Sequence, residues 1–193
     1  MAPKQLNLFL SASIPLQDRH EKYWQTADNI AIRDSVLALA SVALPNFKLI
    51  WGGHPSITPL IAQVLRYKGV DVQGSVTLYQ SLYFKSSFPS ENKDVAHIIK
   101  TNDLGDQDTS LAEMRNRMLS DNEFHAGIFI GGMDGVEEEY ALFRKKHPQA
   151  KVFPIASTGA AAKMIYDTYW NNQQPELLTN LAYSSLFKDL LNL

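Results

Sequence analysis

The segment AGIFIGGMDG, residues 126–135, joins an unbroken apolar run to a turn that contains three glycines. An apolar run that does not alternate with polar residues indicates a strand buried on both faces of a sheet. Glycine at the point where a strand passes into a helix lets the backbone approach a neighbouring group closely. A helix is expected to follow through about residue 146, so the segment predicts one strand–turn–helix unit of a parallel sheet.

The same design occurs earlier in the chain. An apolar run at residues 47–51 leads into Gly52 and Gly53, and a helix is expected up to Gly69, with Thr58 as its cap and Pro59 as its first helical residue. Further strands are expected at residues 6–10, 76–79, 96–100 and 152–155, further helices at residues 28–44, 109–119, 160–170 and 175–191, and a loop around residues 88–91. Strands that alternate with helices predict an α/β, Rossmann-like fold, a doubly wound and mostly parallel sheet with helices on both faces.

Length and charge limit the partners of the chain. Its 193 residues, of which 45% are hydrophobic, fit a single domain over residues 1–193. Its 18 Lys and Arg residues nearly balance its 20 Asp and Glu residues, so the net charge of −2 does not favour a nucleic-acid polymer or an anionic membrane surface. No apolar run approaches the roughly 18 residues of a membrane helix. We therefore expect neither a nucleic-acid partner nor a membrane partner.

The chain contains no cysteine, which excludes disulfides, thiolate nucleophiles and sulfur-ligated metal sites. Residues 1–10 hold too short an apolar run for the core of a signal peptide. These features predict a cytoplasmic protein. No group of His, Asp and Glu has a recognisable metal-ligand spacing, so neither a metal nor another cofactor is expected.

The glycine turns predict where a ligand would bind. In doubly wound folds ligands lie beyond the carboxyl ends of the strands, where helix N-termini present unsatisfied N–H groups that suit a phosphate or carboxylate. Two adjacent glycines can also simply form a tight turn, and neither the three-glycine dinucleotide pattern nor the Walker lysine–serine pattern is present. The candidate ligand contacts at this edge are Ser11, Ser13, Gly52, Gly53, His54, Arg115, Gly131, Gly132, Met133, Glu138, Ser157 and Thr158.

The charged candidates allow two interpretations. The acidic residues 137–139 can simply complement the dipole of the helix that they begin, or Glu138 can point into the cleft and accept hydrogen bonds from a ribose or act at a glycosidic centre. Arg115 and Arg117 lie two residues apart on a predicted helix and cannot face the same way. One of them can reach an anion, and the alternative is a solvated helix face. His54 can contact a phosphate or a base, or it can order the loop before Pro55.

With these motifs the sequence resembles the SLOG superfamily, which joins the DNA-processing Smf/DprA proteins with the LOG (Lonely Guy) phosphoribohydrolases. The resemblance spans most of the chain and rests on FLSAS at residues 9–13, WGGHP at 51–55, IGG at 130–132 and ASTG at 156–159. The chain is particularly similar to the SLOG proteins found beside prokaryotic TIR-type and nucleotide-signalling defence systems. The resemblance implies a Rossmann-like fold that recognises a nucleotide-derived messenger, such as a relative of cyclic ADP-ribose.

The LOG enzymes cleave the N-glycosidic bond of a nucleoside 5′-monophosphate with the glutamate of a PGGxGTxxE motif and an arginine on the preceding helix. In this chain Ile130 stands at the position of the motif's proline, Asp134 and Gly135 replace its glycine–threonine pair, and Glu138 falls on its glutamate. Arg115 lies about one residue from the position of the family's arginine. The resemblance therefore implies Glu138 and Arg115 as the catalytic pair if the chain is an enzyme, although it departs from the motif where the family holds phosphate.

Three functional hypotheses follow. The leading one is a sensor module in which the two glycine turns hold a nucleotide or an ADP-ribose-like molecule, with serine and threonine hydroxyls donating hydrogen bonds and Arg115 neutralising charge. The second is a LOG-like N-glycosidic hydrolase, and the third is an oligomeric scaffold whose glycine turns are only structural. A sensor without an output domain needs partners, so we expect a homodimer or higher homo-oligomer and a separate effector protein.

Overall fold

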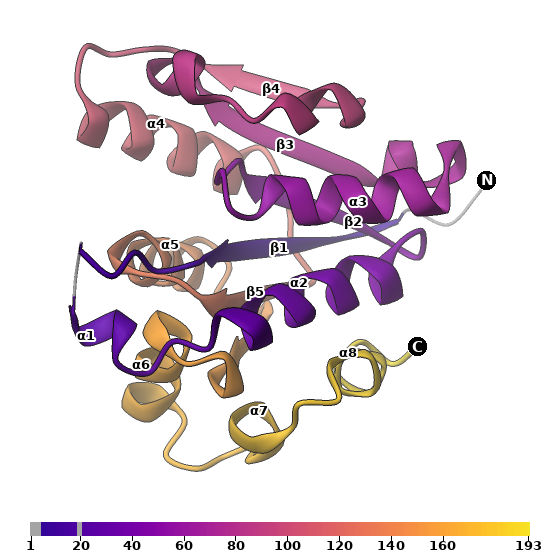
Figure 1. Cartoon of the computed structure of the whole chain (residues 1–193), viewed down its shortest axis with the longest axis vertical. Coiled ribbons are helices and arrows are strands. Elements are labelled where there is room, and N and C mark those ends of the chain that lie inside the picture. The colour runs from indigo at the N-terminus through magenta and orange to yellow at the C-terminus, as the bar shows by residue number, and fades with distance from the viewer. Residues whose placement is uncertain (1–4, 19–20) are drawn as a thin grey trace.

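The computed structural model describes residues 5–18 and 21–193 (Figure 1). The N-terminal residues 1–4, which belong to the segment considered above as a leader, lie outside the described residues. Six parallel strands form one sheet in the order β4-β3-β2-β1-β5-β6. They are β1 Leu6–Ser13, β2 Phe47–Gly52, β3 Val76–Ser81, β4 Ile98–Thr101, β5 Ala126–Gly131 and β6 Lys151–Ile155.

Helices cover both faces of this sheet, which confirms the predicted doubly wound α/β fold (Figure 1). One core lies under α2 Asn29–Ala43, α3 Thr58–Lys68, α7 Glu176–Thr179 and α8 Tyr183–Leu191. The other lies under α1 Glu21–Trp24, α4 Gln107–Ser120, α5 Asp134–Lys146 and α6 Ala160–Tyr169. Within the described residues, no helix is long and apolar enough to cross a membrane.

The strands lie at or within a few residues of the predicted apolar runs, and burial is greatest inside the sheet, whereas the edge strand β4 is only partly buried. Every residue of β3 and of β5 is buried, and Phe9 of the central strand stacks on Phe143 with ring centroids 5.3 Å apart. A loop was expected around residues 88–91. Residues 88 and 89 join two short 3-10 segments, η2 Leu82–Ser87 and η3 Ser90–Asp94, and residues 90 and 91 begin the second. These segments connect β3 to β4 beside the sheet edge.

Two helix boundaries differ from the prediction. Thr58 was expected to cap α3, but Ile57 is the cap residue and Thr58 is buried within the helix, where its Oγ1 accepts a hydrogen bond from Trp51 Nε1 at 3.3 Å. The expected closing helix at residues 175–191 is two helices, α7 and α8. The side-chain oxygen of Asn180 accepts a hydrogen bond from the backbone N–H of Ala182 at 2.8 Å, and this local turn interrupts the helix.

Gly159 provides a test of the turn after β6. It has a φ of +71°, and a Cβ at this position would lie 1.7 Å from the backbone oxygen of Thr26. Gly105 also has a positive φ, +92°, but a Cβ there would meet no atom within 4 Å. We expect Gly105→Ala to lower the free energy of unfolding by about 1 kcal/mol, for backbone strain alone, and Gly159→Ala to lower it by roughly 3 kcal/mol or more.

Urea unfolding followed by circular dichroism measures both losses. Equal losses of free energy of unfolding in the two variants would contradict the close approach of Thr26 to Gly159, because the backbone strain that both positions share would then account for the whole effect.

Candidate functional site

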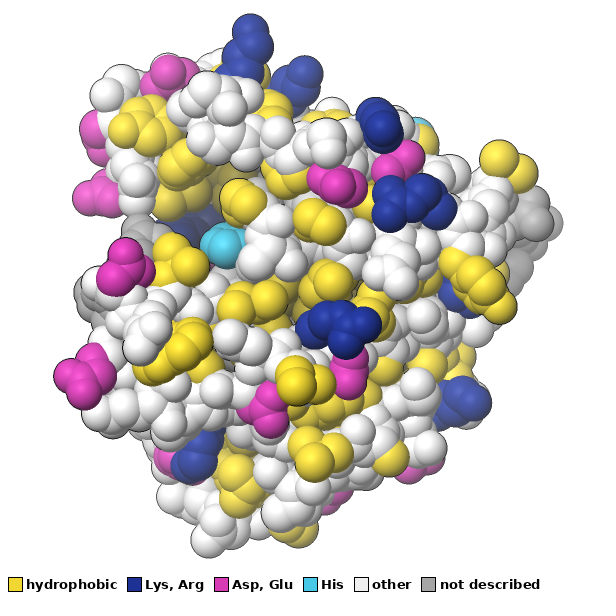
Figure 2. Space-filling model, in the orientation of Figure 1, with side chains coloured by type: hydrophobic (Ala, Val, Ile, Leu, Met, Phe, Trp, Pro, Cys, Tyr) yellow, Lys and Arg dark blue, Asp and Glu magenta, His cyan; other side chains and the backbone are white. Residues whose placement is uncertain are grey.

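A cavity of about 340 Å³ opens at the carboxyl ends of β1, β2 and β3, a size within the range of small-molecule sites. Figure 2 shows a hollow on the side of the molecule to which the strand arrows of Figure 1 point, with hydrophobic side chains beside it. The lining residues are Ala12, Ser13, Gly52, Gly53, His54, Pro55, Gln80, Ser81, Phe84, Ser87, Phe88, Pro89, Gln107, Asp108, Leu111, Met114, Arg115, Met133, Asp134, Gly135, Val136, Glu138 and Glu139.

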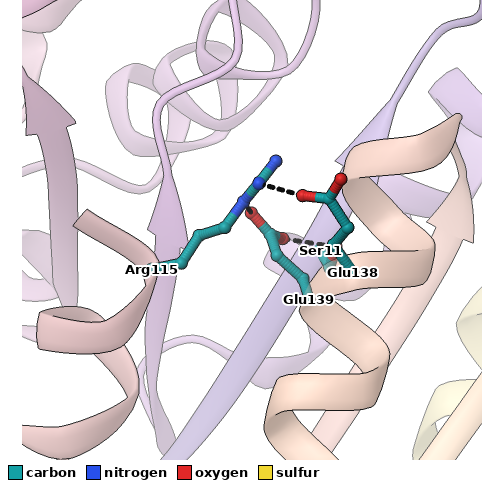
Figure 3. Close-up of polar contacts among 4 residues, drawn as sticks. All are labelled: Ser11, Arg115, Glu138 and Glu139. Carbon is teal, nitrogen blue, oxygen red and sulfur yellow. Dashed lines mark hydrogen bonds and ion pairs between the residues drawn. The ribbon is translucent and has the colours of Figure 1, made fainter. Parts of the chain in front are cut away.

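An ion-pair cluster stands at one side of the cavity (Figure 3). Arg115 projects from α4 and donates hydrogen bonds to two carboxylates of α5, those of Glu138 and Glu139. Its Nε lies 3.3 Å from Oε1 of Glu139. The side chains of Arg115 and Glu139 are only 14% and 13% exposed, whereas that of Glu138 is 61% exposed. The cluster therefore has a buried half, Arg115 with Glu139, and a half that faces solvent, Glu138.

Ser11 of β1 completes the buried half of the cluster. Its hydroxyl donates a hydrogen bond to Oε2 of Glu139 at 2.5 Å. Burial raises the pKa of Glu139, and the neighbouring Glu138 carboxylate adds to this rise, while Arg115 and the Ser11 hydroxyl partly offset it by stabilising the charged form. Glu139 is thus a carboxyl group on which burial and ion pairing act in opposite directions.

The Gly52–Gly53 turn forms the floor of the cavity. A Cβ on Gly52 would lie 3.0 Å from Met114 Cε and 3.9 Å from Oε1 of Glu139, on the α4–α5 side of the sheet. A Cβ on Gly53 would lie 2.7 Å from Nε2 of Gln80, on the α3 side. Gly53 therefore leaves no room for a side chain, whereas at Gly52 an added Cβ would press only on the flexible end of Met114.

Part of the cavity lining is apolar. It comes from the segment between β3 and β4, which supplies Phe84, Phe88 and Pro89, and from Leu111 and Met114 of α4. Aromatic and apolar side chains of this kind can hold a flat ring by stacking and dispersion. The site thus combines a surface suited to a ring with a cluster of charged groups that can bind hydroxyls.

Of the residues predicted from the sequence, seven line the cavity. They are Ser13, Gly52, Gly53, His54, Arg115, Met133 and Glu138. The Nδ1 atom of His54 accepts a hydrogen bond from the backbone N–H of Ser56 at 3.2 Å and also contacts the Ser56 hydroxyl, so one ring nitrogen of His54 orders its own loop.

The other predicted residues lie outside the lining, and their contacts give the reason. Ser11 lies beneath Glu139, and Gly131 and Gly132 carry positive φ angles in the turn itself. The Thr158 hydroxyl accepts from the backbone N–H of Gly131 at 2.8 Å and donates to the carbonyl of Ile155. Ser157 donates to the carbonyl of Asn180 at 3.2 Å and also contacts the Tyr183 hydroxyl at 3.2 Å, so both hydroxyls hold the turn after β6.

The sequence did not single out Glu139 or Gln80, and it did not assign the aromatic residues of the wall to the ligand site. Three consecutive glutamates point in different directions on a helix: Glu137 pairs with Lys22 at 3.4 Å, while Glu138 and Glu139 meet Arg115. Only the packing of α4 against α5 determines which of them is buried. The alternative of a solvated helix face does not apply to Arg115, although Arg117 pairs with Asp121 and is half exposed.

Comparison with known proteins places the chain among its relatives. The family model described as the SLOG cluster3 family matches residues 22–191. No curated protein matches the chain. Among solved structures, the X-ray structure of TM1055, a structural-genomics target, superposes with a TM-score of 0.63 at 13% sequence identity, and the match covers 96% of this chain and 99% of that one. At this identity the likeness shows a shared fold.

The raised pKa of Glu139 has a consequence for stability. The folded protein holds the proton of the Glu139 carboxyl more tightly than the unfolded chain does. Protonation of Glu139 therefore stabilises the folded state fully below the pKa of Glu in the unfolded chain, and this stabilisation is lost as the pH rises through the raised pKa of Glu139 in the folded protein. We therefore expect the wild-type protein to lose free energy of unfolding, relative to Glu139→Gln, as the pH rises from about 4, where Glu titrates in an unfolded chain, through the raised pKa of the folded protein.

Urea unfolding of both proteins across this pH range measures the difference between them. A difference that stays constant, or a wild-type protein that gains stability relative to Glu139→Gln as the pH rises, would contradict the burial of this carboxyl group.

Proposed function

The chain belongs to the SLOG cluster3 family, and from this premise we propose that its cavity binds a nucleotide or a nucleotide-derived signalling molecule of the ADP-ribose kind. In this proposal the chain is a sensor module. The observation that supports it most is the composition of one cavity, which brings an aromatic wall, a glycine floor and the Arg115 cluster within reach of a single small molecule.

The two sides of the cavity suit different parts of such a ligand. A base can rest against Phe84 and Phe88, which line the cavity. Ribose hydroxyls are hydrogen-bond donors, and the exposed Glu138 carboxylate can accept from them. The N-terminus of α5, at Asp134, lies in the same lining and can add backbone N–H donors for a phosphate.

The charges of the lining restrict the ligand further. Four carboxylates, those of Asp108, Asp134, Glu138 and Glu139, line the cavity together with one guanidinium, that of Arg115. Arg115 is already shared between two of these carboxylates. Like charges repel, so this site disfavours a triphosphate and favours a ligand that offers hydroxyls and few phosphates.

A hydrolase is the second candidate, and the contact between Arg115 and Glu138 inside the cavity favours it. In that reaction water would form a bond to the anomeric carbon of ribose as the N-glycosidic bond breaks, and free base and ribose phosphate would be the products. Glu138 would stabilise the oxocarbenium-like charge or activate the water, and Arg115 would hold the phosphate.

The sensor proposal also includes an output. The messenger would be produced in prokaryotic antiviral signalling, and the effect of binding would be transmitted through a homodimer or larger homo-oligomer or through a separate effector protein.

The scaffold hypothesis differs from the sensor proposal in one measurable respect, because a scaffold without a ligand site shows no thermal shift with any nucleotide. A ligand at 100 times its dissociation constant stabilises the folded state by about 2.7 kcal/mol.

The variant Glu138→Gln separates the sensor from the hydrolase. In a sensor we expect intact ligand from wild type and variant alike, and roughly threefold tighter binding of an anionic ligand to the variant, because removal of one charge about 6 Å away in water relieves about 0.7 kcal/mol of repulsion. In a hydrolase, wild type converts the substrate and Glu138→Gln does not. Incubation with nucleoside monophosphates, NAD and ADP-ribose, followed by mass spectrometry and calorimetry, measures both.

The matched control is Glu137→Gln, which removes the adjacent carboxylate that pairs with Lys22 and Tyr23. This control should behave like wild type in both assays. A wild-type protein that neither binds nor converts any of these compounds would contradict the proposed function.

A further inference from the structure

Gln80 lies in the cavity wall on the α3 side and takes no part in the ion-pair cluster. It is the penultimate residue of β3, its side chain is 2% exposed, and its Cγ and Nε2 atoms lie against Gly53. A buried carboxamide of this kind carries a donor and an acceptor, and both normally find partners.

Only one of these two groups is satisfied. The Oε1 atom of Gln80 accepts a hydrogen bond from Nδ2 of Asn92 at 2.7 Å. The Nε2 atom is buried and has no hydrogen-bond partner among the described residues. A buried N–H group without a hydrogen-bond acceptor is costly. At the wall of a cavity, a ligand can supply the missing acceptor.

The partner of Gln80 belongs to the wall that suits a ring. Asn92 lies in η3, and the same connection between β3 and β4 carries Phe84, Phe88 and Pro89. The backbone N–H of Asn92 donates to the carbonyl of Pro89 at 3.1 Å, which fixes Asn92 in its turn. A ring held against this wall therefore meets a carboxamide that is hydrogen-bonded to Asn92, whose own Oδ1 atom is also buried and has no hydrogen-bond partner among the described residues.

We propose that Gln80 recognises the edge of the ligand's ring by donating a hydrogen bond from Nε2 to a ring nitrogen or an exocyclic carbonyl oxygen, with Asn92 as its positioning residue. This inference rests on the proposed function and assigns the base-binding side of the same site. The ligand class is a nucleotide-derived molecule whose heteroaromatic ring carries an acceptor at its edge, and the sugar lies across Gly52 and Gly53 toward Arg115.

The test compares two probes, ADP-ribose and ribose 5-phosphate, which lacks the base. Gln80→Met keeps the length of the side chain and removes the amide. We expect it to weaken ADP-ribose on the order of tenfold, the effect of one hydrogen bond to a buried group, and to leave ribose 5-phosphate unchanged. Gln80→Glu keeps an acceptor for Asn92 Nδ2 but removes the donor. Because an added carboxylate also repels both anionic probes, we expect it to weaken ADP-ribose more than ribose 5-phosphate.

Gln73→Met is the matched control, because Gln73 also has a buried, unpartnered carboxamide atom but does not line the cavity. It should bind both probes as wild type does. Calorimetric dissociation constants for wild type and the three variants give the comparison.

Equal binding of ADP-ribose by wild type and both Gln80 variants, or an equal loss for both probes, would overturn the role of Gln80 and leave the proposed function standing. A wild-type protein that binds neither probe would overturn the role of Gln80 toward a ligand of the ADP-ribose kind, and the proposed function itself would fall only if nucleoside monophosphates and NAD also failed to bind.

Discussion

The parallel pairing of β1 with β2 on one side and with β5 on the other is the constraint on which the site depends. The chain moves outward from β1 through β2 to β4 and then crosses to the other side of β1 at β5. At such a change of direction the connections after neighbouring strands diverge, and a crevice opens at their carboxyl ends. Ser13, Gly52 and the N-terminus of α5 all reach this crevice because three strands end at the same edge (Figure 1).

Within the crevice, charge rather than shape distinguishes this chain from a phosphate cradle. Arg115 is held between two carboxylates, and one of them, Glu139, is buried and anchored by Ser11 (Figure 3). A guanidinium committed in this way attracts a phosphate less than an unpaired one would, since the Glu138 carboxylate, and that of Glu139 when it is ionised, offset the charge of Arg115. The same carboxylates accept hydrogen bonds readily, which suits the hydroxyl groups of a sugar.

The sequence predicted the fold well because its signals are local. Buried strands appear as apolar runs, and Gly52–Gly53 and Gly131–Gly132 mark the ends of two of them.

Two residues of the site could not be predicted from the sequence. The burial of Glu139 depends on how α4 packs against α5, and Gln80 lies on a strand that is buried throughout. Ser157 and Thr158 follow β6, which pairs only with β5, and their hydroxyls bond to the chain itself. The resemblance to the SLOG superfamily is confirmed by the family match over residues 22–191.

The most direct test of the ligand site is mass spectrometry of the small molecules released when the purified protein is denatured, compared with the mass of the native protein before release. We expect a nucleotide or nucleotide-derived compound, retained in near-equimolar amount and with its N-glycosidic bond intact. Release of a compound without a nucleoside, retained in the same amount, would contradict the account, because the aromatic wall and the sugar-binding carboxylates would then have no corresponding group in the ligand.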